Sequence, residues 1–141
     1  MTFISMVVDS ADMATLAGIR VLVVEDDPDT RDVVAVMLER AGAEVLHAAS
    51  SAAGILVVEQ ARPDAIVADI EMPGEDGYAF VSKLRALPAA RGGATPAVAL
   101  TAYASLTDRL VALRSGFQVY VPKPVAPADL VTIVARLVGK V

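Results

Sequence analysis

Five short apolar runs alternate along this chain with segments in which apolar residues recur at helical spacing. The runs do not alternate between apolar and polar residues, which is typical of strands buried on both faces of a parallel sheet. They predict strands at 19–24, 43–48, 64–69, 96–100 and 118–121. The segments between and after them predict helices over about 28–41, 51–61, 76–88, 105–115 and 127–138.

Local signals support some of these limits better than others. Asp27 is the expected N-cap of the first helix, because Pro28 suits a first helical position. The helix over 51–61 has the weakest pattern, since Gly54 lowers its propensity. Two glycines in the segment 89–95 predict a mobile loop.

Regular alternation of strands and helices predicts right-handed βαβ units, and therefore an α/β fold in which helices cover both faces of a parallel sheet. Residues 18–141 suffice for one such domain. Residues 1–17 have no clear period, and we expect a tail or linker in preference to an added helix.

Composition removes several classes of function. The chain has no cysteine, which excludes a disulfide framework, a thiolate nucleophile and a zinc-finger pattern. Its net charge is −5 and it has no Lys/Arg block, so we expect no nucleic-acid partner. No apolar run has the length of a membrane span, and the N-terminus lacks a secretory signal pattern. We therefore expect a cytoplasmic protein without a membrane partner.

Four of the five predicted strands are followed by polar side chains that suit one chemical site. They are Glu25 and Asp26 after the first strand, Asp69 at the third, Thr101 at the fourth and Lys123 after the fifth. The carboxyl ends of parallel strands form the crevice in which α/β proteins bind ligands. Carboxylates gathered there repel one another unless they hold protons or a cation, and Mg²⁺ is the cation that such oxygen ligands suit.

These residues could together receive a phosphoryl group. A carboxylate such as Asp69 can attack phosphorus, and aspartyl phosphate is an established class of covalent intermediate. Phosphoryl transfer requires mainly positioning and neutralisation of the phosphoryl oxygens. Thr101, Lys123 and the backbone N–H of Ala102 are the expected hydrogen-bond donors to the phosphoryl oxygens, and Mg²⁺ would neutralise part of their charge.

Four motifs at the strand ends resemble the receiver domain of two-component response regulators: VLVVEDD, IVADIEMPGEDG, VALTAYA and GFQVYVPKPV. The resemblance covers residues 20 to about 138. It implies a flavodoxin-like (βα)5 doubly wound parallel sheet with strand order 2-1-3-4-5. It also implies that Asp69 is the phosphoacceptor, and that the phosphoryl group comes from the phosphohistidine of a histidine kinase or a phosphotransfer protein in a phosphorelay.

The resemblance implies further roles at the site. Asp26 and Asp69 would bind Mg²⁺ with the backbone carbonyl of Glu71, and Glu25 would act through water. Thr101, Ala102 and Lys123 would bind the phosphoryl oxygens. Tyr120 would turn inward when Thr101 moves toward the phosphate, and the bond Lys123–Pro124 would be cis.

The resemblance also implies that the residues at two positions that vary in this family, Glu71 and Tyr103, modulate the lifetime of the phosphate. Our hypothesis is that they shield the aspartyl phosphate from water. Other polar and aromatic residues have simpler structural interpretations. Asp76 is expected to cap the third helix, and His47 has no context that suits a phosphodonor. Packing is the expected role of three aromatic residues: Tyr78, Phe80 and Phe117.

The leading interpretation is a signalling switch that modifies only itself and is not an enzyme acting on other substrates; its downstream partner is unknown. The chain would be a single-domain regulator or the receiver of a hybrid sensor kinase, and the flanking sequences slightly favour the second.

A Mg²⁺-dependent phosphatase with an aspartyl nucleophile, similar to haloacid dehalogenases, is the alternative, although their nucleophile follows the first strand. A dinucleotide-binding module fails because no glycine-rich turn follows that strand. A phosphate-independent protein-binding module stays open.

Overall fold

The computed structural model describes residues 15–103 and 105–140. Five parallel strands form one sheet in the order β2-β1-β3-β4-β5, which confirms the predicted fold class and strand order. The strands are β1 (Arg20–Val24), β2 (Glu44–Ala48), β3 (Ala65–Asp69), β4 (Ala97–Thr101) and β5 (Val119–Pro122).

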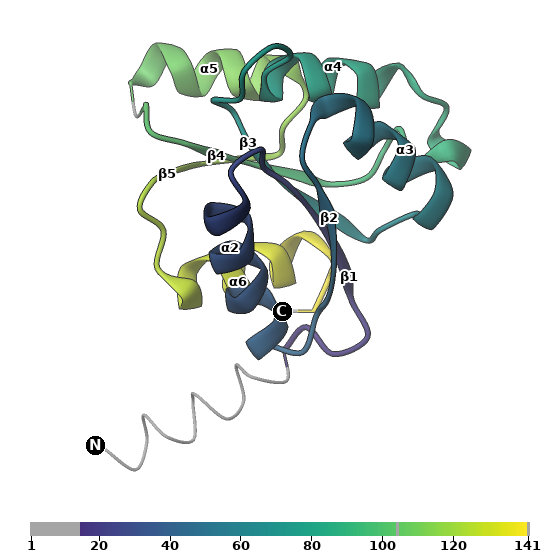
Figure 1. The fold of residues 1–141 in the computed structure, drawn as a ribbon, viewed down its shortest axis with the longest axis vertical. Coiled ribbons are helices and arrows are strands. Elements are labelled where there is room, and N and C mark those ends of the chain that lie inside the picture. Colours follow the sequence, from purple (N-terminus) through teal and green to yellow (C-terminus); the bar gives the residue numbers. More distant parts are fainter. Residues whose placement is uncertain (1–14, 104, 141) are drawn as a thin grey trace.

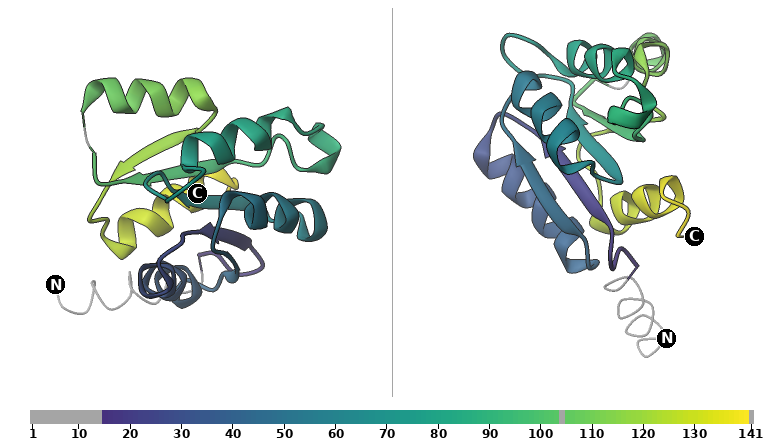
Figure 2. Two further views of the ribbon diagram at one scale, coloured as in Figure 1. Left: turned by 45° about the horizontal axis from the view of Figure 1, so that its top comes forward. Right: turned by 90° about the vertical axis from the view of Figure 1, so that its right-hand side faces the viewer.

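Helices cover both faces of this sheet. On one face lie α2 (Pro28–Arg40) and α6 (Pro127–Leu137). On the other lie α3 (Ser51–Ala61), α4 (Gly77–Ala86) and α5 (Leu106–Ser115), shown in Figure 1 and from two further directions in Figure 2. All five were predicted, with limits within two residues. No helix in residues 15–103 and 105–140 is long and apolar enough to cross a membrane.

The sheet separates two apolar cores. Along β1, Val21 and Val23 face the core under α2 and α6, while Leu22 and Val24 face the core under the other three helices. Successive strand side chains point to opposite faces, so burial of both faces requires an unbroken apolar run. The second core also contains the predicted packing aromatics, with Phe80 fully buried.

Tertiary contact explains the glycine in α3. A Cβ on Gly54 would lie 2.8 Å from Cε1 of Phe80, so the missing side chain lets α3 approach the ring on α4. The hydroxyl of Ser50 caps the helix by accepting a hydrogen bond from the N–H of Ala53 at 3.1 Å. Packing therefore outweighs the low helix propensity in this segment.

The segment expected to be a mobile loop contains a 3₁₀ turn, η1 (Ala89–Arg91), and is bonded to α4. Arg85 donates hydrogen bonds to the carbonyls of Gly93 and Thr95 at 2.9 and 2.7 Å. Gly93 is buried so closely that a Cβ would lie 1.8 Å from the carbonyl oxygen of Leu87. The glycines thus permit close packing here, which the sequence pattern did not reveal.

Leu16 packs with the domain, although the sequence placed it in the tail. Its side chain is fully buried, and its N–H donates to the carbonyl of Ala41 at 2.7 Å. Residues 1–14, which hold most of the predicted tail, lie outside the described residues.

Candidate functional site

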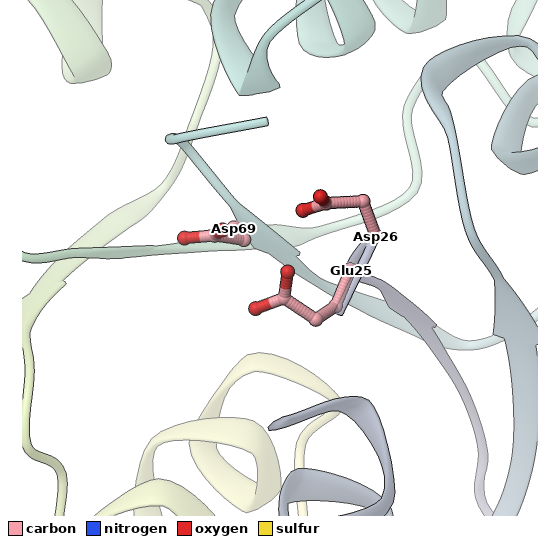
Figure 3. A group of neighbouring side chains, drawn as sticks. All are labelled: Glu25, Asp26 and Asp69. Carbon is pink, nitrogen blue, oxygen red and sulfur yellow. The ribbon is translucent and has the colours of Figure 1, made fainter. Parts of the chain in front are cut away.

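Three carboxylates meet where β1 and β3 end. Glu25 and Asp26 follow the last residue of β1, and Asp69 is the last residue of β3, its neighbour in the sheet. One oxygen from each of the three carboxylates lies within 4.8 Å of the others (Figure 3). Glu25 and Asp69 are each only 5% exposed. The predicted acidic cluster therefore forms, from residues 44 positions apart.

Burial and the neighbouring acids raise the pKa of Glu25. Burial raises its pKa from 4.5 to about 7, although the N–H of Asp27 donates to its Oε2 at 3.2 Å and opposes this shift. A hydrogen bond with Asp26 and the charge of Asp69 raise the pKa further. Three converging oxygen ligands with this unfavourable charge suit a hard divalent cation, so the donor set fits Mg²⁺.

Lys123 supplies the positive charge of the site. It follows β5 with a cis bond to Pro124, as expected, and its Nζ lies 2.7 Å from Asp69 Oδ1 and 3.8 Å from Glu25 Oε1. Burial opposes the charge on Lys123, but the hydrogen bond to Asp69 and the surrounding acids outweigh it and raise its pKa. The lysine is therefore held as a cation beside the predicted acceptor.

The two predicted phosphoryl donors at the end of β4 are bonded to Glu71. The hydroxyl of Thr101, which is buried, donates to Glu71 Oε2 at 2.5 Å. The N–H of Ala102 donates to Glu71 Oε1 at 2.8 Å. The sequence indicated a role for Glu71 but not this contact. The only indication of this contact in the sequence was that Glu71, an acid, follows Asp69 by two residues. In the structure, the strand that ends at Asp69 pairs with the strand that ends at Thr101.

Tyr120 lies inward. The residue is half-buried against the core under α5, and its hydroxyl is buried with no hydrogen-bond partner among the described residues. Burial also raises the pKa of this hydroxyl. By contrast, the side chain of Tyr103 is 61% exposed, while its N–H donates to Thr101 Oγ1 at 3.0 Å. The shielding roles of Glu71 and Tyr103 stay predictions.

Gly77 positions the acceptor in a way that sequence reasoning missed. A Cβ on Gly77 would lie 2.6 Å from the carbonyl oxygen of Asp69 and 2.8 Å from the Cα of Ile70. Only glycine therefore lets α4 begin directly against the end of β3. Asp76 caps this helix as predicted, accepting the N–H of Ala79 at 2.9 Å.

Asp27 likewise caps α2 as predicted, because its Oδ2 accepts the N–H of Thr30 at 3.0 Å. It is exposed and is not one of the three clustered acids. His47 is exposed on β2, one of the two edge strands, where it lies beside Val23 of β1, and it is not part of the acidic cluster.

Comparison with known proteins identifies the family. A sequence model of the response regulator receiver domain matches residues 21–135. The chain belongs to the response regulator receiver family. The acidic cluster thus lies in a receiver domain of two-component signalling, as its motifs predicted.

Relatives of this receiver domain differ in length. It is 46% identical over 124 residues to an uncharacterized 14.6 kDa protein in the sodA1 3' region of Leptolyngbya boryana, with 88% of this chain and 93% of the relative covered. It is 36% identical over 121 residues to the sensor protein GacS of Pseudomonas syringae pv. syringae, covering 85% of this chain but only 13% of GacS. The receiver domain therefore spans nearly all of one relative and a small part of the other.

A solved structure has both the fold and the metal. The receiver domain of sensor histidine kinase PA1611 from Pseudomonas aeruginosa is 36% identical, with a TM-score of 0.79 and coverage of 87% of this chain and 99% of that one. That structure has a magnesium ion coordinated in its active-site cleft. Receiver domains pair with histidine kinases or phosphotransfer proteins, so the predicted class of partner is confirmed at that level.

Proposed function

We propose that this receiver domain accepts a phosphoryl group on Asp69 in a Mg²⁺-dependent transfer from the phosphohistidine of a histidine kinase or phosphotransfer protein. One observation carries the proposal. The buried carboxylate of Asp69 lies 2.7 Å from Lys123 Nζ and beside two further acids, on the strand next to the one that ends in Thr101. This arrangement combines a nucleophile with the charges that phosphoryl transfer requires.

The transfer conserves atoms and charge. One carboxylate oxygen of Asp69 attacks phosphorus, the phosphorus–nitrogen bond of the phosphohistidine breaks, and its electron pair returns to the imidazole, which takes up a proton from solvent water. An acyl phosphate on Asp69 results. Lys123 Nζ, the Thr101 hydroxyl and the Ala102 N–H would bind the phosphoryl oxygens, because all three belong to the same end of the sheet.

Glu25, Asp26 and Asp69, with the backbone carbonyl of Glu71, would hold Mg²⁺. When bound, the ion offsets the negative charge of the carboxylates and phosphoryl oxygens. Support comes from the convergent oxygens of this chain and from the magnesium ion in the related PA1611 receiver. The raised pKa of Glu25 adds to it, since a carboxyl that is costly to ionise alone is stabilised by a cation.

The phosphodonor would dock on α2. This helix begins two residues after Asp26, and it exposes Val33 and Val36 at 55% and 44%. A groove of about 410 Å³ with an apolar lining runs along these valines to Pro127 on α6. An amphipathic donor helix would pack its apolar face in this groove, on the helix that begins two residues after Asp26.

The output would be a changed affinity for a partner protein. Phosphorylation would bias Thr101 and Tyr120, and with them the face formed by α5, β5 and α6. Exposed leucines on α5, among them Leu106 and Leu110, offer that face apolar contacts. The domain would modify only Asp69, so we do not propose an enzyme with external substrates.

Intact mass spectrometry tests the acceptor chemistry. The domain is incubated with Mg²⁺ and acetyl phosphate, alongside Asp69→Asn and the control Asp64→Asn, which alters an exposed acid immediately before the same strand. We expect one labile phosphoryl adduct in the wild type and in Asp64→Asn. The adduct should be absent from Asp69→Asn and after chelation of Mg²⁺.

A phosphorylated histidine kinase is then used as a second donor. If the wild type forms no adduct with either donor while it remains folded and binds Mg²⁺, the proposed acceptor function is wrong. The phosphate-independent binding module would then be the better interpretation, and partner binding unaffected by Asp69→Asn would support it.

A further inference from the structure

The side chain of Glu71 occupies a place that the proposed function assigns to phosphoryl oxygens. Its two carboxylate oxygens accept hydrogen bonds from the Thr101 hydroxyl at 2.5 Å and from the Ala102 N–H at 2.8 Å. These are two of the three donors expected to bind a phosphoryl group on Asp69. A carboxylate resembles a phosphoryl group in presenting negatively charged oxygens to the same donors.

We propose that Glu71 is an internal counter-ligand: its carboxylate binds the Thr101 and Ala102 donors in the unphosphorylated domain and must leave before phosphoryl oxygens bind there. This inference rests on the proposed function of Asp69 and deepens it. Glu71 is thus a positioning residue that lowers the affinity of the site for a phosphoryl group.

Phosphoryl oxygens must replace the Glu71 carboxylate, because each of these two donors has only one proton to share. A hydroxyl has one proton, and that of Thr101 is directed to Glu71, while Thr101 Oγ1 accepts the N–H of Tyr103 at 3.0 Å. Ala102 likewise has a single N–H, which also points to Glu71. A phosphoryl oxygen therefore competes with Glu71 for both protons. Two anionic groups at the same donors would also repel each other.

The exchange needs movement of one side chain only. The residues on either side of Glu71 are anchored, since Ile70 and Met72 are 4% and 7% exposed. The N–H of Ile70 donates to the carbonyl of Leu100 at 2.9 Å, and its carbonyl accepts the N–H of Gly77 at 3.0 Å. Glu71 itself is half-buried at the surface, so a rotamer change moves its carboxylate while the backbone stays in place.

The contact also affects the proposed switch. With Glu71 in place, the Thr101 hydroxyl is directed to an anion and the Tyr120 hydroxyl is buried. This is the arrangement expected when a phosphoryl group binds Thr101. Loss of the Glu71 carboxylate should therefore have two effects: it frees the donors for a phosphoryl group, and it releases Thr101 and Tyr120 while that group is absent.

The test compares the wild type with Glu71→Ala, Glu71→Gln and Glu75→Ala. Glu75 is a matched control, because it is an exposed acid in the same loop that pairs with Lys83 and does not contact Thr101 or Ala102. Each protein is titrated with beryllofluoride, a phosphoryl analogue, in saturating Mg²⁺. Binding is followed through the amide resonance of Ala102, and thermal unfolding verifies the fold of each variant.

We expect Glu71→Ala to bind beryllofluoride about tenfold more tightly than the wild type, as removal of a competing charge-assisted hydrogen bond implies. Glu71→Gln should lie between them, since it keeps one acceptor oxygen but no charge. Glu75→Ala should match the wild type. Without beryllofluoride, the Ala102 amide and Tyr120 ring resonances should move in Glu71→Ala but not in Glu75→Ala.

Equal affinity in the wild type, Glu71→Ala and Glu75→Ala would overturn the counter-ligand role and leave the acceptor function of Asp69 standing. Weaker binding by folded Glu71→Ala would also overturn it, because Glu71 would then help to hold the phosphoryl group. If no protein binds beryllofluoride although Mg²⁺ binds, the proposed acceptor function fails and the counter-ligand role fails with it.

Discussion

Replacement of Glu25 by glutamine should stabilise the metal-free domain at neutral and alkaline pH. The side chain is buried beside Asp26 and Asp69, and its pKa rises from 4.5 to about 7, chiefly through burial. Glutamine has nearly the same shape and keeps an oxygen that can accept the N–H of Asp27, which donates to Glu25 Oε2 at 3.2 Å. The substitution therefore removes the charge with little change in packing.

The expected gain follows from the link between pKa and folding. A carboxyl with a higher pKa in the folded state binds its proton more strongly there, so ionisation costs stability as the pH rises through 4.5, and the cost levels off above about pH 7. The two pKa values correspond to a cost of about 3 kcal/mol at about pH 8 and about 1 kcal/mol at about pH 5. Glu25→Gln should recover most of this difference.

Urea unfolding at these two pH values, in the presence of a chelator, measures the effect. The control is Glu39→Gln, which neutralises an exposed acid on α2 and should leave the free energy of unfolding nearly unchanged. Saturating Mg²⁺ should narrow the difference in free energy of unfolding between Glu25→Gln and the wild type. The wild type keeps the charge of Glu25 and should bind Mg²⁺ more tightly, and a ligand of the folded state stabilises the protein that binds it more tightly.

An equal free energy of unfolding for Glu25→Gln and the wild type at the higher pH would refute the argument that burial of this charge is costly. A gain of the same size at both pH values would refute it as well, because the stabilisation would then not come from ionisation of Glu25.

Three further substitutions test how the site is built. Gly77→Ala should lower the free energy of unfolding by about 2 kcal/mol and slow phosphorylation, because its Cβ would lie 2.6 Å from the carbonyl of Asp69; urea unfolding and intact mass measure the two effects. Arg85→Ala should cost about 2–4 kcal/mol in urea unfolding, since it leaves the carbonyls of Gly93, Thr95 and Gly116 without this donor. Lys123→Gln should tighten Mg²⁺ binding in a calorimetric titration, because a competing cation is lost, yet slow phosphorylation at least about tenfold.

The fold could be predicted from the sequence because each strand and helix has its own local apolar pattern, and these patterns alternate along the chain. Strands buried on both faces need unbroken apolar runs, and amphipathic helices need a periodic apolar face, so each element is legible without knowledge of its neighbours. Asp69 and Lys123 were found for a related reason: a parallel sheet brings the carboxyl ends of its strands to one edge, so polar residues at those ends meet.

Contacts between side chains and loops were not predictable in this way. The approach of Gly77 to Asp69 and the bonds from Arg85 to the loop after α4 depend on distances between elements that no periodic pattern encodes. The same holds for burial of Leu16, which follows no helical or strand period but packs in the core beside α2 and α6.

The sequence by itself determined the five strands and helices, the acidic cluster and the lysine, because local hydrophobic order and strand ends specify them. Only the tertiary structure decided that Glu71 binds Thr101 and Ala102, because that contact joins the loop after β3 to the end of the neighbouring strand β4 and the residue that follows it. Such a contact depends on side-chain reach and on which donors are left unpaired, and both are properties of the assembled site.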